Sequence, residues 1–318
     1  MGRGVTEDGT GTAPRARPSR IETPSGSGGL PRVGYLGPAG TFSEEALQAS
    51  AHPGSCEPVA IATIYDTVSA VRDGTVRWAV VPIENSLDGS VTVTLDLLAD
   101  DRGDLEIVGE ALLAVHHALI AAEPLSLEAI ETVLSHPQVP GQCTRLLRGE
   151  LAHAQVLPAS STAEAVRIVG TSGVPGQAAL GTRLAAEIYG ATVIRDGVQD
   201  RDDNVTRFVW LARGGEHAEG PDLPPLAALA GERWKTSVVF WGPGADSPGW
   251  LVSCLNEFAR RSINLTKIES RPRRGALGHY MFFADLEGSV REPAVAEAVD
   301  GLRAACEHVR ILGSYLAA

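Results

Sequence analysis

The feature that most constrains the fold of this 318-residue chain is a repeated alternation of short apolar run, polar turn and helical segment between residues 33 and 190. This alternation is typical of α/β sheets whose faces are covered by helices. Ligands of such sheets bind beyond the carboxyl ends of the strands. We therefore expect several polar turns to converge on one site for a small molecule, with hydroxyl and amide side chains as its donors.

The expected elements follow from the apolar periodicity. Strands are expected at 33–36, 78–83, 105–108, 132–134, 154–157 and 177–180, and helices at 44–50, 61–73, 93–98, 165–169 and 184–189, with a further helix beginning at Gln142. Beyond residue 233, strands are expected at 236–241, 263–270, 279–286 and 309–315, and helices at 250–261 and 292–305. This second series has the βαββαβ order of a ferredoxin-like unit.

Two segments lack any periodic apolar pattern. Residues 1–31 are rich in Gly, Pro, Ser, Thr and Arg and are expected to form a disordered tail. Residues 214–233 contain several Pro and Gly residues and are expected to be a linker. The sequence thereby divides into two ordered parts, residues 32–213 and residues 234–318.

The composition excludes several classes of protein. No apolar run reaches the roughly 18 residues that cross a bilayer, and the N-terminus has no charged-then-apolar leader, so we expect a cytoplasmic protein. The four cysteines share no CxxC motif, which suits reduced thiols. The eight histidines show no ligand spacing, and we expect neither a metal nor another cofactor.

The net charge of −12 is concentrated in the middle of the chain, where residues 33–233 hold 27 acidic side chains against 12 basic ones. A surface of this kind repels nucleic acid and anionic lipid, so we expect neither as a partner. An anionic substrate would have to be held by local donors, because no broad positive field exists to attract it.

Residues 202–210 (DDNVTRFVW) place one hydroxyl, Thr206, where an acidic run gives way to an apolar strand. A threonine at the mouth of a sheet can reach a ligand, but threonine is also common inside strands. Residues 37–43 (GPAGTFS), which precede a helix, also allow two interpretations. Their backbone N–H groups could bind an anion, or Thr41 or Ser43 could cap the helix. Both choices stay open at this point.

Four motifs resemble the signatures of one family. They are residues 37–43 (GPAGTFS), residues 82–86 (PIENS), residues 135–138 (SHPQ) with Gln142 and Cys143, and residues 206–208 (TRF), and in this order they resemble prephenate dehydratase. From Val238 onward the chain resembles the ACT regulatory domain that follows it in the family. There, residues 249–252 correspond to a Gly-Ala-Leu-Val motif and residues 269–272 to a Glu-Ser-Arg-Pro motif.

The resemblance implies a fold and a reaction. Residues 32–213 would form a catalytic domain of two α/β lobes of the type 2 periplasmic-binding-protein kind, with the active site in the cleft between them. The linker 214–233 and an ACT domain at 234–318 would follow. The reaction implied is the conversion of prephenate to phenylpyruvate, water and carbon dioxide in phenylalanine biosynthesis. No chorismate mutase region precedes Val33, so a monofunctional enzyme is expected.

The resemblance also implies site residues. Thr206 corresponds to the family's catalytic threonine and is the expected donor to the leaving oxygen. The residues expected to orient or bind the substrate are Thr41, Glu84, Asn85, Ser86, Ser135, Gln138, Gln142 and Arg207. Two of these keep alternatives open. Glu84 could hold its loop or lie near the leaving group, and Arg207 could pair with a substrate carboxylate or, from the opposite side of the strand, with Asp202 or Asp203.

Regulation by phenylalanine is implied in the same way. ACT domains of this family commonly pair across an interface and bind phenylalanine there, which implies a homodimer or homotetramer. The corresponding effector residues are Gly249, Trp250, Leu251, Glu269, Ser270, Arg271 and Pro272. Trp250 replaces a small residue of the motif, and its indole could fill the effector pocket, reshape it for another aromatic amino acid, or pack at a dimer interface.

Two other functions remain as alternatives. An arogenate dehydratase would act on a substrate with an amino group in place of the keto oxygen, and the sequence does not separate the two substrates. A non-catalytic amino-acid-sensing module would share the lobes and the ACT domain, but the intact motif at Thr206 argues against it.

Overall fold

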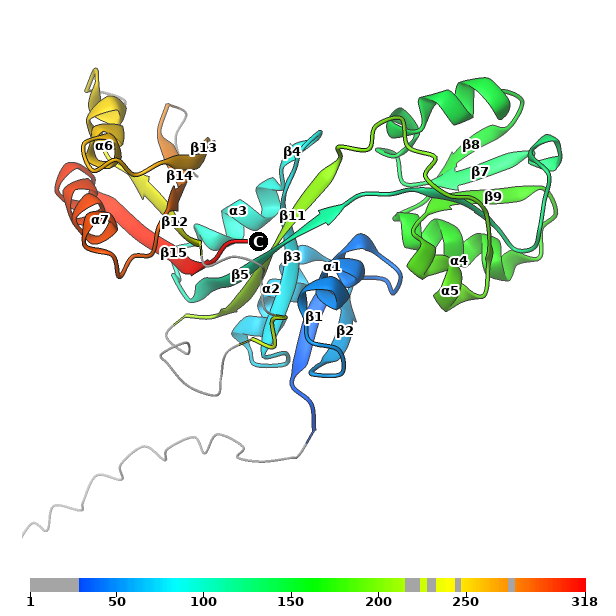
Figure 1. Ribbon diagram of the computed structural model, residues 1–318, viewed down its shortest axis with the longest axis horizontal. Helices are drawn as coiled ribbons and strands as arrows, with labels where there is room; N and C mark the ends of the chain where they lie inside the picture. The colour runs from blue at the N-terminus through cyan, green and yellow to red at the C-terminus, as the bar shows by residue number, and fades with distance from the viewer. Residues whose placement is uncertain (1–28, 215–223, 228–232, 244–246, 274–277) are drawn as a thin grey trace, which may run out of the picture.

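The computed structural model describes residues 29–214, 224–227, 233–243, 247–273 and 278–318. They form a mixed α/β structure with three sheets (Figure 1). Most of the expected tail and most of the expected linker lie outside the described residues. Of the linker, residues 224–227 are described, and Leu226 packs against the core of the first lobe and forms a bridge with Ala51.

The first lobe is built on a six-stranded sheet with the order β2-β1-β3-β11-β5, to which β4 is added beside β3. Its strands are β1 (Arg32–Leu36), β2 (Glu57–Ile61), β3 (Trp78–Asn85), β4 (Gly89–Ser90), β5 (Leu105–Ala114) and β11 (Val205–Arg213). Its helices are α1 (Phe42–Ser50), α2 (Ile64–Arg72) and α3 (Thr92–Leu98). Side chains of α1 share a core with one face of this sheet, and those of α2 and α3 share a core with the other.

The second lobe is a five-stranded sheet with the order β10-β6-β9-β7-β8. Its strands are β6 (Ala118–Ala121), β7 (Thr132–Ser135), β8 (Gln155–Pro158), β9 (Gln177–Gly181) and β10 (Thr192–Arg195). Its helical segments are α4 (Thr162–Ser172), α5 (Arg183–Tyr189), the 3₁₀ turns η1 (Leu127–Ala129) and η2 (Pro140–Gln142), and the π-helical turn η3 (Leu146–Glu150). Two segments connect the lobes, one after β5 and one before β11 (Figure 1).

The C-terminal part has the expected βαββαβ order. Its elements are β12 (Trp234–Trp241), α6 (Trp250–Ala259), β13 (Leu265–Pro272), β14 (Tyr280–Glu287), α7 (Pro293–Ala305) and β15 (His308–Leu316), with the antiparallel sheet order β13-β14-β12-β15. Alternation along β12 explains its two faces. Val238 and Phe240 pack under α6 and α7, whereas Val239 joins the core that contains α2 and α3 of the first lobe.

The differences from the sequence-based expectation concern edges and lengths. The expected helix at 61–73 begins only at Ile64, because residues 57–61 form β2. Both β2 and β10 are edge strands of their sheets, and their side chains are exposed or half-buried, so they lack a clear apolar pattern. The strand expected at 105–108 continues to Ala114, and the segment after Gln142 forms a π-helical turn instead of a regular helix.

The two lobes touch directly through the turn that precedes α1. The hydroxyl of Thr182 donates to the carbonyl of Gly40 at 2.6 Å, and the hydroxyl of Tyr189 donates to the carbonyl of Ala39 at 2.9 Å. Gly40 has a φ of +86°, and a Cβ there would lie 2.7 Å from the Cα of Ala185. The Gly-rich turn is therefore in contact with α5. Thr41 sits at the N-cap of α1, but its hydroxyl donates to the Leu36 carbonyl and makes no cap bond, so the capping alternative does not hold for Thr41.

This contact generates a prediction for the pH dependence of stability. Burial, with a smaller contribution from Glu187 and Glu44, raises the pKa of Glu45 from 4.5 to about 7. The folded protein holds this proton more tightly than the unfolded chain, so the stabilising contribution is present below pH 4.5 and is lost as pH rises through 7. We expect Glu45→Gln to raise the free energy of unfolding by about 1 kcal/mol at pH 8, after discounting for solvent screening, and by much less at pH 5.

The measurement is urea unfolding of both proteins at the two pH values, with Glu123→Gln on an exposed loop as the matched control. An equal gain at pH 5 and pH 8 would contradict the assignment, because it would reflect packing and not titration.

Candidate active site

A β-bulge between β3 and β11 aims the polar side chains at the ends of these strands. Thr206 is paired with Asn85 and Arg207 with Glu84, but the next pair is Phe208 with Pro82, so Ile83 is left as an extra residue. Proline lacks an N–H and is tolerated in a sheet at such bulges. Directly opposed residues share a face of the sheet. The bulge therefore puts Asn85 on the same face as Thr206, and Glu84 on the same face as Arg207.

A chain of side-chain hydrogen bonds begins at Asn85, and the orientation of its amide is determined by the backbone. The N–H groups of Leu87 and Asp88 both donate to Asn85 Oδ1, each at 2.9 Å, so the other end of the amide must be the NH₂ group. This Nδ2 lies 2.8 Å from Thr206 Oγ1 and 2.8 Å from Asn204 Oδ1. The oxygen of Thr206 is therefore an acceptor, and its own proton is left for another partner.

The chain continues into the second lobe. Because Asn204 Oδ1 accepts, its Nδ2 is the donor, and it reaches Gln142 Oε1 at 3.1 Å. His117 Nε2 lies 3.1 Å from the same oxygen and must carry a proton to donate to it. The His117 side chain is buried, and burial lowers the pKa of its ring, so the ring is neutral with Nδ1 unprotonated. Two backbone amides thus determine the donor directions from Thr206 to His117.

Asn204 and His117 were not among the expected site residues. Asn204 lies two positions before Thr206 in residues 202–210, and its short amide before a buried strand is the signal that could have identified it. His117 offered no such signal, since its partner Gln142 is 25 positions away in the sequence. The ring of His117 also makes an edge contact with Phe42 of α1, with centroids 5.4 Å apart.

The other residues expected to bind the substrate differ in their burial and in their hydrogen-bond partners. Ser86 closes its turn on β11: its hydroxyl donates to the Asp203 carbonyl and accepts from the Val205 N–H at 3.0 Å. Ser135 is buried and donates to the neighbouring His136 carbonyl at 3.3 Å. Gln138 is exposed after β7. Hydrogen bonds link Asn85 to Thr206 directly and to Gln142 through Asn204. By contrast, the hydroxyl bonds of Ser135 and Thr41 are local to their own turns.

Arg207 requires a correction. Its Nε contacts Glu110 Oε2 at 2.6 Å, its Nη1 contacts Asp285 Oδ2 at 2.5 Å, and its Nη2 donates to the Tyr315 hydroxyl at 2.8 Å. Asp202 and Asp203 instead accept hydrogen bonds from Gln199 and Arg201, respectively. Alternation along the strand points the guanidinium away from Thr206 and into the contact with the C-terminal sheet. Its partners are Glu110, Asp285 and Tyr315 and not Asp202 or Asp203, and the buried guanidinium lies on the opposite side of the strand from Thr206.

Glu84 shares this contact. Its carboxylate lies 3.1 Å from Lys267 Nζ of β13 and 3.6 Å from Arg207 Nη1. Of the two roles left open for Glu84, the contacts correspond to the structural one, because the bulge turns it to the side opposite Thr206.

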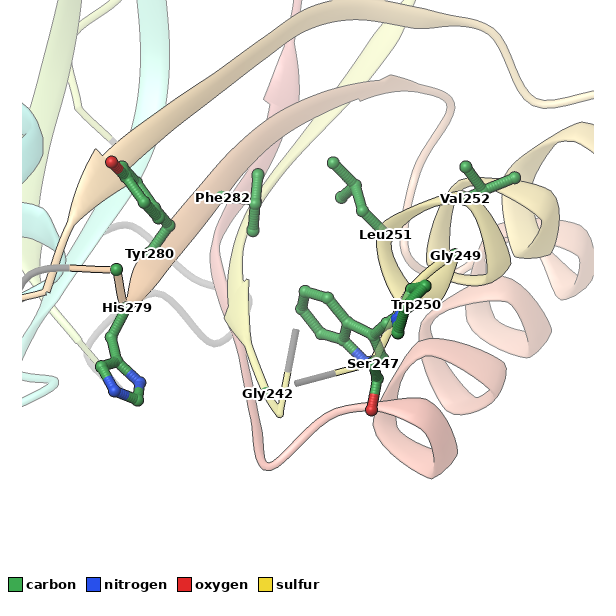
Figure 2. A pocket seen from close by; sticks show the side chains of 11 residues that line it. Gly242, Ser247, Gly249, Trp250, Leu251, Val252, His279, Tyr280 and Phe282 are labelled. Atoms are coloured by element: carbon green, nitrogen blue, oxygen red, sulfur yellow. The ribbon is translucent and has the colours of Figure 1, made fainter. Parts of the chain in front are cut away.

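A cavity of about 350 Å³ lies beside the beginning of α6 and includes three of the expected effector residues. Gly249, Trp250 and Leu251 line it, together with Gly242, Ser247, Pro248, Val252, Gly278, His279, Tyr280 and Phe282 (Figure 2). The indole of Trp250 packs near the rings of Phe240 and Phe282, with centroids 6.3 and 5.9 Å away, and its N–H donates to the Ala305 carbonyl at 2.7 Å. The indole therefore forms a wall of the cavity and is anchored to the end of α7.

The other four expected effector residues lie elsewhere. Glu269 accepts a hydrogen bond from Ser90, and Arg271 makes a bidentate contact with Asp96 at 2.9 and 3.0 Å, so both face the first lobe. Ser270 is exposed, and Pro272 lines a second cavity of about 530 Å³ between α3 and the C-terminal sheet. Within one copy of the chain, Gly249, Trp250 and Leu251 therefore lie together at the cavity, whereas the four residues of β13 lie away from it.

Two further expectations concern a metal site and a membrane-spanning helix. Among the residues that the structure describes, no group of three or more His, Cys, Asp or Glu side chains is arranged to hold a metal ion. Within the same residues, every helix is too short or too polar to traverse a membrane.

The molecule is a two-lobed α/β protein with an additional antiparallel unit. Two segments join the lobes, and hydrogen bonds between amide and hydroxyl side chains run from one lobe to the other. The family model described as prephenate dehydratase matches residues 33–216. A prephenate dehydratase of Mycolicibacterium vanbaalenii is 38% identical over 299 residues, covering 90% of this chain and 91% of the relative. The chain belongs to the prephenate dehydratase family.

Solved structures agree with this family in fold. The prephenate dehydratase of Arthrobacter aurescens in complex with L-Phe superposes with a TM-score of 0.77 at 34% identity, covering 89% of both chains. The protein GqqA, described as a novel type of quorum quenching acylase, superposes with a TM-score of 0.78 at 28% identity and covers 90% of this chain and 98% of its own.

The donor directions derived above can be tested without any activity measurement. We expect ¹⁵N-NMR of the histidine rings to show His117 as the neutral tautomer protonated at Nε2, and to show this form persisting below pH 6.5, because burial opposes its protonation. In Asn204→Ala the Oε1 atom of Gln142 loses one of its two donors, and the His117 resonances should shift. Observation of the Nδ1-protonated tautomer in the wild-type protein would refute the derived orientation of Gln142.

Proposed function

We propose that this protein catalyses the decarboxylating dehydration of prephenate to phenylpyruvate, in the biosynthesis of phenylalanine. The observation that carries the proposal is the orientation of Thr206: Asn85 donates to its oxygen, so the hydroxyl proton points to a further acceptor. Residues 32–213 would be the catalytic part, with two lobes of the type 2 periplasmic-binding-protein kind. Membership of the prephenate dehydratase family supports the choice of substrate.

The reaction needs catalysis mainly at the bond between the ring and its hydroxyl oxygen. Breakage of the ring–carboxylate bond releases carbon dioxide, and its electron pair enters the ring and expels the ring hydroxyl, which takes a proton and leaves as water. The product is aromatic, so the reaction is strongly downhill and the barrier lies in the leaving hydroxide. A donor to this oxygen contributes a factor of about 10² to 10⁴. A threonine hydroxyl is a weak acid, so Thr206 acts by a directed hydrogen bond to the leaving oxygen.

The remaining acceleration has to come from positioning. Asn85 and Asn204 hold Thr206 in place, and Ser86 fastens the turn after β3 onto β11. Gln142 keeps its Nε2 only loosely engaged, 3.4 Å from Asp88, and would donate to a substrate carboxylate. Ser135 and Gln138, at the carboxyl end of β7, would bind the substrate from the second lobe. Thr41 would hold the turn before α1.

The decisive experiment compares variants of Thr206. Thr206→Val keeps the shape but removes the hydroxyl, and we expect it to lower kcat by about 10² to 10⁴ while the unfolding temperature stays close to that of the wild type. Thr206→Ser retains the hydroxyl and should keep most of the activity. Phenylpyruvate formed from prephenate is measured by its ultraviolet absorbance in alkali, and phenylalanine formed from arogenate is measured in parallel by amino-acid analysis. Turnover by Thr206→Val within tenfold of the wild type would remove this hydroxyl from the mechanism.

The parallel assay also separates the remaining alternatives. Preference for arogenate would identify an arogenate dehydratase that uses the same residues. Absence of turnover on both substrates, in a protein that binds an aromatic amino acid, would identify a non-catalytic sensing module.

We propose further that residues 234–318 form a ferredoxin-like ACT domain that binds phenylalanine in the 350 Å³ cavity. The cavity is of a size that holds a small ligand, and Leu251, Tyr280 and Phe282 give it apolar walls. The described complex of the Arthrobacter relative with L-Phe supports this choice of ligand. Trp250 is tied to Ala305, so the indole shapes the cavity instead of occupying it.

An oligomer is part of the same proposal. Three apolar side chains near the cavity or on the edge strand β13 are exposed: Val252 to 61%, Ile268 to 48% and Tyr280 to 45%. Burial of these side chains against a second copy would make a homodimer, and light scattering measures whether dimers or tetramers form.

Calorimetry with phenylalanine tests the regulatory part. We expect Leu251→Asp to weaken phenylalanine binding at least tenfold, because a carboxylate is placed in an apolar wall beside the ligand. Ala294→Ser, exposed on α7 and outside the lining of the cavity, should bind within twofold of the wild type. Tyrosine and tryptophan are titrated alongside. Binding of none of the three would end the regulatory proposal and leave the dehydratase reaction untouched.

A further inference from the structure

Two cysteines that take no part in the proposed reaction lie in contact inside the C-terminal unit. The Sγ atoms of Cys254 and Cys306 are 3.6 Å apart, although 52 positions separate them in the sequence. Cys254 is in the second turn of α6 and is completely buried. Cys306 follows directly after α7, in extended backbone, and is partly exposed. One cysteine of the pair is thus partly exposed, and the other is buried.

The distance between the sulfurs suits bond formation. A disulfide has a sulfur–sulfur distance of about 2.05 Å, so the two atoms need to approach by roughly 1.5 Å. Cys306 lies past the last helical residue of α7, where the backbone can shift without breaking a turn of the helix. By contrast, the half-exposed Cys56 and the buried Cys143 belong to other parts of the fold, in the first and second lobes.

We propose that Cys254 and Cys306 form a redox-sensitive site that is reversibly oxidised to an intramolecular disulfide by a peroxide. Peroxide oxidises the accessible Cys306 thiol to a sulfenic acid and releases one water. The Cys254 sulfur then attacks the Cys306 sulfur, forms the disulfide and expels hydroxide, which takes the Cys254 proton and leaves as a second water. Two thiols lose two electrons and two protons, and one peroxide is reduced to two waters.

The position of the pair links it to the cavity beside α6. Ala305, immediately before Cys306, accepts the indole N–H of Trp250, and Trp250 is a wall of that cavity (Figure 2). The backbone of Gly242 packs closely against the indole and Cys306, because a Cβ there would lie 2.8 Å from the indole and 3.3 Å from the Cα of Cys306. Drawing the sulfurs together therefore moves either the end of α7 or the first turns of α6, and the cavity wall with them.

The first test asks whether the bond forms. The reduced full-length protein is treated with equimolar hydrogen peroxide and analysed by thiol titration and peptide mass spectrometry. We expect loss of two thiols, a mass decrease of about 2 Da, a cross-linked peptide pair containing Cys254 and Cys306, and full reversal by dithiothreitol.

Matched variants make the result specific. Cys56→Ser/Cys143→Ser should still lose two thiols, whereas Cys254→Ser and Cys306→Ser should form no intramolecular cross-link. Oxidation that stops at sulfinic acid, that joins two chains, or that leaves Cys254 and Cys306 unmodified would overturn the proposal.

The second test concerns the consequence for the cavity and rests on the proposed phenylalanine site. We expect the affinity for phenylalanine to differ at least threefold between the reduced and the cross-linked protein, and to be unaffected by peroxide in Cys306→Ser. An unchanged affinity in fully cross-linked protein would overturn the link to the cavity. Turnover of prephenate in the same samples shows separately whether the dehydratase proposal holds.

Discussion

The charge of Arg207 is buried at the contact between the first lobe and the C-terminal sheet, and the position of β11 depends on the pairing of this charge. Glu110 and Asp285 balance the guanidinium, Tyr315 accepts from it, and Lys235 lies 2.7 Å from Glu110. Burial alone lowers the pKa of Arg207, but these neighbours outweigh it and hold the pKa above its usual value. Removing one partner of such a group costs about 3–5 kcal/mol of stability. The stability of the first lobe therefore depends on its contact with the C-terminal sheet.

Strand β11 connects this buried charge to the candidate active site, because its side chains alternate between two environments. Phe208 and Trp210 belong to the core under α1, whereas Val209 and Leu211 belong to the core shared with the C-terminal sheet. Thr206 and Arg207 continue this alternation to the polar end of the strand. One strand thus has the proposed catalytic hydroxyl on one face and the buried charge on the other, a single residue apart.

Much of this architecture could be predicted from local pattern, and the rest could not for a physical reason. The βαββαβ order and the buried strands such as β3 and β9 follow from apolar periodicity, and the proximity of Asn85, Gln142 and Thr206 follows from motifs. The bulge at Ile83, the partners of Arg207 and the link from Asn204 to His117 depend on pairings of residues that are far apart in the sequence. No local signal reports which residue stands opposite another, so neither Glu110 nor Asp285 was among the partners considered for Arg207.

The same geometry explains how the C-terminal sheet can act on the proposed site without touching it. Lys267 of β13 contacts Glu84, the residue before Asn85, and Asp285 of β14 contacts Arg207, the residue after Thr206. The bulge places these two contacts on one side of the sheet and the 2.8 Å bond between Asn85 and Thr206 on the other. A small displacement of β13 relative to β14 would therefore change the spacing of the two strands at the bond that orients the threonine hydroxyl.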